Sequence, residues 1–148
     1  MKFAEGTTVA VSKTRGQIEE LAAKHGATRF ASGWTEKGAA INFVCRGRLL
    51  RFVLPVPDRE EIARELRKRR RSFPTAKMID DAAAAEERRR WRALLLVIKG
   101  RFESAEDGIE TFDEAFLAHI VTADNMTMIE HLQVADSPIK LLTAGDGN

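Results

Sequence analysis

The chain has 148 residues, of which 44% are hydrophobic, and a formal net charge of +2. This length and hydrophobic fraction are typical of one folded domain with its own core, and they exclude an intrinsically disordered chain. The single cysteine excludes an internal disulfide framework and favours a reducing compartment. No apolar run could span a bilayer and no signal peptide is visible, so we expect a soluble, cytoplasmic protein with one domain over residues 1–148.

The charge is distributed unevenly along the chain. Residues 1–58 have a net charge of +4, residues 59–101 have +7, and residues 102–148 have −9. A basic middle segment followed by an acidic end is compatible with a surface that binds polyanions. It is equally compatible with neutralisation of the two segments by each other, either within the fold or across a homodimer.

The N-terminal part predicts a short strand and then a helix. Residues 1–6 have no pattern and are expected to be a flexible start, whereas β-branched residues alternate over residues 7–11 and indicate a short edge strand. Thr14 and Gln17 have the spacing of a capping box, which predicts that the helix begins at Thr14. Gly26 is placed to end this helix in a left-handed conformation.

An antiparallel meander is predicted next, from alternating segments separated by turn residues. Its strands are residues 28–34, 39–45 and 48–54. These strands contain four aromatic residues, namely Phe30, Trp34, Phe43 and Phe52. A small sheet must bury one face, so we expect these rings in the core beneath a helix, together with Cys45. The alternative is that some are exposed and stack on nucleic-acid bases.

The most apolar stretch of the chain predicts a long central helix that begins near Thr75 and ends near Gly108. Its apolar face is formed by residues at helical spacing, namely Trp91, Leu94, Leu95, Ile98 and Phe102. Leu96 and Val97 widen this face, so we expect other elements to cover the helix on more than one side. Trp91 is expected to fill the junction between the sheet and the helices.

Three further capping boxes predict shorter helices. In each box a glutamate follows the first residue by three positions: Asp58 with Glu61, Thr111 with Glu114, and Thr127 with Glu130. Residues 137–148 are expected to be a flexible tail. The expected fold is therefore α+β: an antiparallel meander of three to four strands packed against a long central helix and shorter helices.

Two groups of cations are the most suggestive functional feature, because guanidinium groups suit phosphate oxygens. The candidate nucleic-acid-binding residues are Arg67, Lys68, Arg69, Arg70, Arg71, Arg88, Arg89 and Arg92, with Arg90 in the same run. The alternative is a solvated helix end, or ion pairs with the acidic C-terminal third and with the nearby glutamates Glu60, Glu61, Glu65, Glu86 and Glu87.

Other chemistry is not indicated by the sequence. His25, His119 and His131 have no metal-ligand spacing, and the glycines form no nucleotide-binding motif, so we expect no metal and no cofactor. An enzymatic activity is the last-ranked alternative, because no catalytic motif is present. The order helix, three strands, helix over residues 14–71 resembles the topology of the double-stranded-RNA-binding domain. However, the acidic start at residues 58–61 departs from that family and argues against binding of duplex RNA.

Several segments resemble a family of small uncharacterised proteins encoded by tailed phages and prophages. They are residues 88–99 (RRRWRALLLVIK), 108–121 (GIETFDEAFLAHIV) and 14–19 (TRGQIE), with residues 26–28 and 33–34. The resemblance extends over most of residues 9–132 and departs near residues 124–126, where a glycine-containing turn is expected.

This resemblance implies a viral origin. We therefore expect a phage accessory protein in the host cytoplasm that contacts DNA or RNA through its arginine residues, in replication, recombination or counter-defence. The alternative is a protein-binding inhibitor of a host or anti-phage defence complex, in which the surface charge serves partner recognition.

Overall fold

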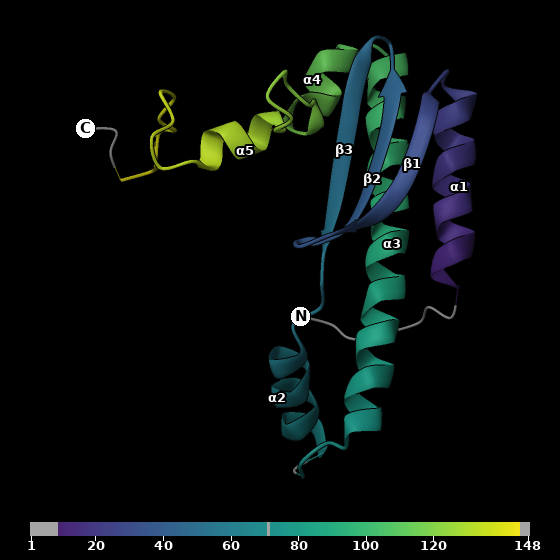
Figure 1. Ribbon diagram of the computed structural model, residues 1–148, viewed down its shortest axis with the longest axis vertical. Helices are drawn as coiled ribbons and strands as arrows, with labels where there is room; N and C mark the ends of the chain where they lie inside the picture. The colour runs from purple at the N-terminus through teal and green to yellow at the C-terminus, as the bar shows by residue number, and fades with distance from the viewer. Residues whose placement is uncertain (1–8, 71, 146–148) are drawn as a thin grey trace.

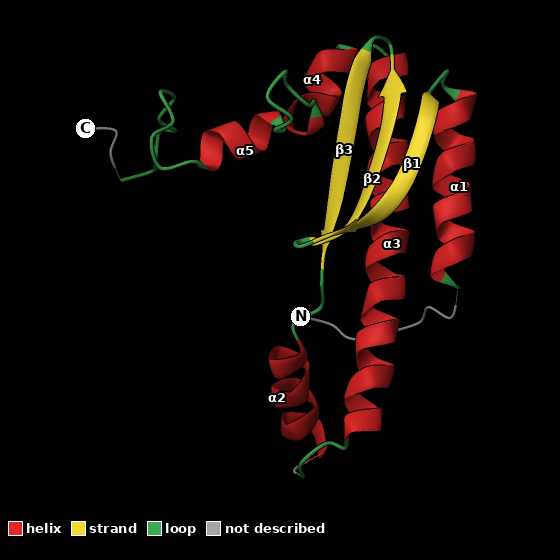
Figure 2. Cartoon of the chain, in the orientation of Figure 1, coloured by secondary structure: helices red, strands yellow, loops and turns green. Residues whose placement is uncertain are grey.

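A computed structural model describes residues 9–70 and 72–145, and it has a layer of helices behind a three-stranded sheet (Figures 1 and 2). The elements are α1 (Val11–Lys24), β1 (Thr28–Thr35), β2 (Gly38–Cys45), β3 (Arg48–Pro55), α2 (Arg59–Arg70), α3 (Ala76–Glu106), α4 (Phe112–Phe116), the 3-10 turn η1 (Leu117–His119) and α5 (Met128–Gln133). The predicted α+β fold is confirmed, with three strands rather than four in the described residues.

The sheet is an antiparallel meander in the order β1-β2-β3. The pairing of β2 with β3 is regular, and the connecting turn places Arg46 and Gly47 at φ values of +50° and +75°. Two positive φ values match the twist of a tight hairpin. The register of the pairing between β1 and β2 shifts between Thr28 and Ala31, and Arg29, within this irregularity, has a φ of +54°.

Helices α1 and α3 pack on one face of the sheet and form the main core with it (Figure 1). Its largest fully buried side chains include Ile18, Ile41, Phe43, Leu50, Ile98, Phe102 and Phe116. Trp91 is 2% exposed, as predicted, and Cys45 is also buried. Phe43 and Phe52 are buried, and Phe30 packs against the same cluster.

Helix α3 is much longer than the sheet that it covers. Its 31 residues span about 46 Å, whereas a strand of eight residues spans about 27 Å. The N-terminal part of α3 therefore extends past the sheet and packs against α2 instead (Figure 1). There Ile62 and Ala82 form a separate small cluster. Thr75 caps α3 as predicted, since its side chain accepts a hydrogen bond from the Met78 amide at 3.2 Å.

The predictions for the N-terminal region are wrong in two respects. Helix α1 begins at Val11 with Ala10 as its N-cap, so no strand includes residues 9–11, while residues 7 and 8 lie outside the described part of the chain. Thr14 is fully buried inside the helix rather than at its start. It lies one turn before Ile18 on the face that packs into the core, so tertiary packing outweighs its preference for a cap.

Three large apolar residues are exposed although the sequence predicted cover for them. The exposed fractions are 72% for Trp34, 65% for Leu96 and 45% for Val97. The sheet and α1 occupy neighbouring sides of α3, so the side that bears Leu96 and Val97 faces solvent. Trp34 pairs with Ala39 near the turn of the β1–β2 hairpin; Ala39 belongs to the main core, but the Trp34 side chain does not.

The capping boxes of the C-terminal part are confirmed. The Thr111 side chain accepts a hydrogen bond from the Glu114 amide, and the Glu114 carboxylate accepts one from the Thr111 amide. Thr127 and Glu130 repeat this arrangement at the start of α5. Helix α5 and the segment after it extend away from the sheet (Figure 1).

Of the predicted flexible ends, residues 137–145 contain no helix or strand, whereas residues 1–6 and 146–148 lie outside the described residues. Within residues 9–70 and 72–145, no helix has both the length and the apolar character needed to cross a membrane.

Gly38 permits the close pairing of β2 with the end of β3. Its φ is +143°, and an added Cβ would overlap the backbone carbonyl of Leu54. We predict that Gly38→Ala lowers the free energy of unfolding by about 2 kcal/mol or more, measured by urea denaturation. Gly33→Ala is the matched control, because its Cβ would lie in open space and the change should stay within about 0.5 kcal/mol. Equal effects of the two variants would contradict this role.

Candidate nucleic-acid interface

The first group of candidate cations forms the last turn of α2. Arg67, Lys68, Arg69 and Arg70 are all exposed there, close to the point where the chain turns back into α3 (Figure 1). Cations are favoured at this end because they interact with the negative end of the helix dipole. Arg71 lies outside the described residues.

Within the described part of the chain, few groups bind these cations. Lys68 lies 3.6 Å from Glu65 with its side chain 76% exposed, so this pair contributes little. The Arg67 guanidinium lies over the ring of Phe73, 4.2 Å from the centroid, and Phe73 is 78% exposed. Among the described residues, Arg69 and Arg70 have no hydrogen bond or ion pair. The last turn of α2 therefore presents four cations to solvent, and Phe73, in the connection to α3, presents an aromatic ring.

The second group of candidate cations, on α3, is bound within the protein. Glu86 is fully buried, and its two oxygens accept hydrogen bonds from the Arg89 guanidinium at 2.6 and 3.0 Å. Arg90 donates to the same carboxylate at 3.0 Å and to the Pro55 carbonyl at 2.8 Å. These two guanidinium groups therefore compensate a buried negative charge.

The electrostatics of Glu86 are consistent with this role. Burial alone raises the pKa of the Glu86 carboxyl, but the hydrogen bonds and charges of Arg89 and Arg90 outweigh burial and hold that pKa below its usual value. Glu86 is consequently ionised at neutral pH. Its removal would leave two arginine residues without their counter-charge.

Arg92 contacts α1, and Arg88 is partly buried. The Arg92 guanidinium donates a hydrogen bond to the Gln17 side chain at 2.5 Å. Arg88 is half-buried, and its Nε atom is buried without a partner in the described residues. Between Ala76, at the start of α3, and Arg88 the helix rises about 18 Å. The structure thus separates the two groups of cations that the sequence analysis combined.

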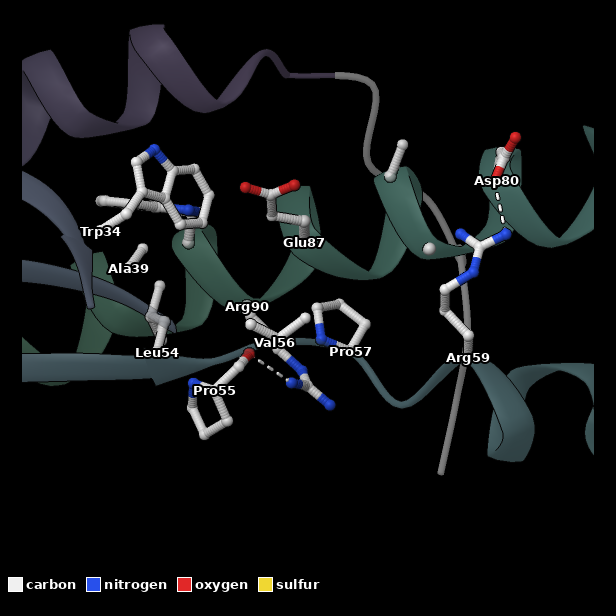
Figure 3. Close-up of a pocket in the computed structure, with 13 residues that line it drawn as sticks. Trp34, Ala39, Leu54, Pro55, Val56, Pro57, Arg59, Asp80, Glu87 and Arg90 are labelled. Atoms are coloured by element: carbon white, nitrogen blue, oxygen red, sulfur yellow. Dashed lines mark hydrogen bonds and ion pairs between the residues drawn. The ribbon is translucent and has the colours of Figure 1, made fainter. Parts of the chain in front are cut away.

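An apolar groove lies between the end of the sheet and α3 (Figure 3). Its cavity volume is about 340 Å³. Trp34 and Leu54 lie at one end of the groove, and the ion pair of Arg59 with Asp80, at 2.6 Å, lies at the other. This groove can accept an apolar or planar group, and its lining residues include no Ser, Thr, Cys, Lys or His side chain.

Each of the three histidines contacts a neighbouring side chain, as His25 does with Phe102. His119 stacks on Phe52 with ring centroids 4.1 Å apart, and burial lowers its pKa, so it is neutral at pH 7. His131 lies 3.0 Å from Asp124 and 2.8 Å from the Thr122 hydroxyl. In the described residues, no three His, Cys, Asp or Glu side chains are grouped so that they could hold a metal ion.

The buried thiol of Cys45 is unsuited to nucleophilic chemistry. Its Sγ atom lies 3.6 Å from the His25 carbonyl, to which it donates a hydrogen bond. Burial raises the pKa of the thiol, although the charge of Arg46 opposes this effect. The thiolate is therefore scarce at neutral pH.

Comparisons with protein-family models, curated proteins and solved structures found no match to this chain. The resemblance to phage proteins therefore stays a prediction from the sequence. Sequence reasoning did not single out Phe73 as a possible contact residue. Its position between Ser72 and Pro74, outside any periodic segment, was a signal that its ring lies on the surface.

Glu86 should be required for stability, whereas its neighbour should not. We predict that Glu86→Gln lowers the free energy of unfolding at pH 7 by about 2 kcal/mol, because two arginine residues lose their counter-charge. Since the pKa of Glu86 is lowered in the folded protein, its contribution is present at neutral pH and is lost as the pH falls through that pKa. Denaturation curves of wild type and variant should approach each other as the pH falls below the ordinary glutamate pKa, and they should converge below the lowered pKa of Glu86.

Glu87→Gln is the matched control for this experiment. Glu87 follows Glu86 in α3 and has no ion pair or hydrogen bond in the described residues. Its replacement should change the free energy of unfolding by no more than about 0.5 kcal/mol. A difference between wild type and Glu86→Gln that persisted at low pH would show that the carboxylate charge is not the cause.

Proposed function

We propose that the protein binds single-stranded DNA or RNA through the last turn of α2 and the adjoining loop. The observation that supports this proposal is the exposed set of Arg67, Lys68, Arg69 and Arg70 next to the exposed ring of Phe73. The cations contact phosphates, and the ring stacks on a base. This combination of a cationic surface with an aromatic ring is typical of proteins that bind single strands without strong sequence preference.

In this proposal the arginine residues of α3 have a supporting role. Arg89 and Arg90 bind Glu86, and Arg92 binds Gln17, so these three guanidinium groups are held in place by partners within the protein. They fix the middle of α3, from which the α2–α3 hairpin extends past the sheet. The nucleic-acid contacts are therefore assigned to the tip of that hairpin.

We also propose that the protein is a non-enzymatic phage accessory protein that acts in the host cytoplasm, in replication, recombination or counter-defence. The resemblance of residues 88–99 and 108–121 to proteins of tailed phages supports the viral origin. The single cysteine, which is free and buried, is compatible with a reducing compartment.

The second candidate function is inhibition of a host or anti-phage defence protein. The groove that is lined by Trp34 and Leu54 favours this candidate, because an exposed tryptophan beside an apolar groove is typical of protein-binding surfaces. Under this alternative, variants of the groove would abolish function whereas variants of the α2 turn would not.

Removal of the α2 cations should weaken nucleic-acid binding. We predict that the triple variant with Gln at Arg67, Arg69 and Arg70 binds a fluorescent single strand about tenfold or more weakly at low salt. Four phosphate contacts to a single strand predict a slope of about −3 in a plot of log affinity against log salt concentration, and the variant should reduce it to about −1. Fluorescence anisotropy over a salt series measures both quantities.

The control variant removes the same charge elsewhere, with Gln at the exposed residues Lys13, Lys24 and Lys140. It should leave the slope and the low-salt affinity nearly unchanged. Circular dichroism of both variants verifies that α2 and α3 remain folded. The absence of any binding by the wild-type protein at low salt would refute the proposal.

Phe73 should distinguish single strands from duplexes. We predict that Phe73→Ala weakens binding to a single strand by about tenfold, since stacking of one base on an aromatic ring contributes about 1–3 kcal/mol. Binding to duplex DNA should not change, because paired bases are already stacked. An equal loss for both nucleic acids would assign the effect to the position of Arg67 instead.

A further inference from the structure

The side of α3 that faces away from the sheet has an apolar stripe. Leu96 and Val97 are 65% and 45% exposed, and Ala93 and Gly100 on the same side are exposed too. Their spacing of three and four residues places them in one row along the helix. No element among the described residues covers this row, which we call the α3 stripe (Ala93, Leu96, Val97, Gly100).

Nothing in the described part of the single chain requires a glycine, rather than a residue with a side chain, at position 100. Glycine is one of the least favourable residues in the interior of a helix, and Gly100 lies well inside the 31 residues of α3. A Cβ built at this position would meet no atom within 4 Å. The benefit of a missing side chain there is that another backbone can approach closely.

The charges at the two ends of the α3 stripe have opposite signs. Arg89 lies before the stripe with its side chain 38% exposed; its Nε and Nη2 atoms bind Glu86, and its Nη1 atom has no hydrogen bond in the described residues. Glu103 and Asp107 lie after the stripe and are exposed. Such a surface is complementary to itself when the second copy is turned end to end. A parallel second copy would instead place like charges next to each other.

We propose that the α3 stripe binds a second copy of this chain about a two-fold axis, with the two α3 helices antiparallel. When Leu96 lies opposite the partner's Gly100, the close approach at glycine provides space for the leucine. Two helical turns further along, the same register places Arg89 opposite the partner's Asp107. The apolar contact and the ion pair are thus satisfied together, and each occurs twice by symmetry.

This proposal is independent of the proposed nucleic-acid binding. It uses a different part of α3 from the hairpin tip, and it explains why a helix predicted to be covered on several sides exposes two large aliphatic residues. The failure of either proposal leaves the other intact.

The oligomeric state of the full chain tests the proposal. Analytical ultracentrifugation over a concentration series should show a monomer–dimer equilibrium for the wild type. Leu96→Glu should convert the protein to a monomer without loss of helical circular dichroism. The matched control is Leu141→Glu, since Leu141 is 66% exposed on the C-terminal tail, and this variant should dimerise like the wild type.

A wild-type protein that is monomeric at every concentration would overturn the proposal, and so would a Leu96→Glu variant that still dimerises. Gly100→Ala provides an independent readout. It should raise the thermal stability of the monomer, because alanine favours the helix, and at the same time weaken the dimer. A dimer unchanged by Gly100→Ala would exclude close approach at this position.

Cross-linking tests the orientation. Cys45 is buried, and Cys45→Ser provides a background without thiols. In the proposed register, Ala93 lies opposite the partner's Glu103, whereas the two copies of Ala93 lie about 15 Å apart along the axis. A short bismaleimide should therefore link Ala93→Cys chains to Glu103→Cys chains in a mixture. Efficient linking of Ala93→Cys chains alone would show a parallel pair and refute the antiparallel arrangement.

Discussion

The mismatch in length between α3 and the sheet determines most of this structure. The helix spans about 46 Å and the strands about 27 Å, so one surface of the sheet cannot cover the whole helix. In its C-terminal half, α3 buries Trp91, Ile98 and Phe102 against the sheet and α1. In its N-terminal part it buries Ala82 against Ile62 of α2. Because the N-terminal part of α3 extends past the sheet, the cationic last turn of α2 lies apart from the rest of the protein (Figure 1).

Glu86 lies where α3 changes from one packing partner to the other. A fully buried carboxylate costs several kcal/mol unless charged donors compensate it, and Arg89 and Arg90 together provide three such donors. Arg90 also binds the Pro55 carbonyl at the end of β3, so the same cluster fixes the chain as it leaves the sheet. In the sequence, this run of arginine residues resembles a polyanion-binding motif. In the structure, Arg89 and Arg90 bind Glu86, and Arg90 connects α3 to the end of β3.

The elements that the sequence predicted are those that local interactions determine. The meander, its tight turn at Arg46 and Gly47, and the capping box at Thr111 depend on neighbouring residues. Exposure of Leu96 depends on what lies opposite it in space, which helical periodicity does not encode. The pairing of Glu86 was partly predictable, since arginine residues three and four positions later lie on the same side of a helix. The open alternative of ion pairs with Glu86 was thus correct for Arg89 and Arg90.

The two proposals are linked by the geometry of α3. If two copies pair antiparallel about the level of Ile98, the start of each α3 lies 22 residues, or about 33 Å, from the axis, in opposite directions. The two cationic turns are then about 65 Å apart. A single strand must therefore be long enough to span this distance in order to contact both. Shorter strands bind one tip at a time, and longer ones gain the avidity of a second contact without any change in the site itself.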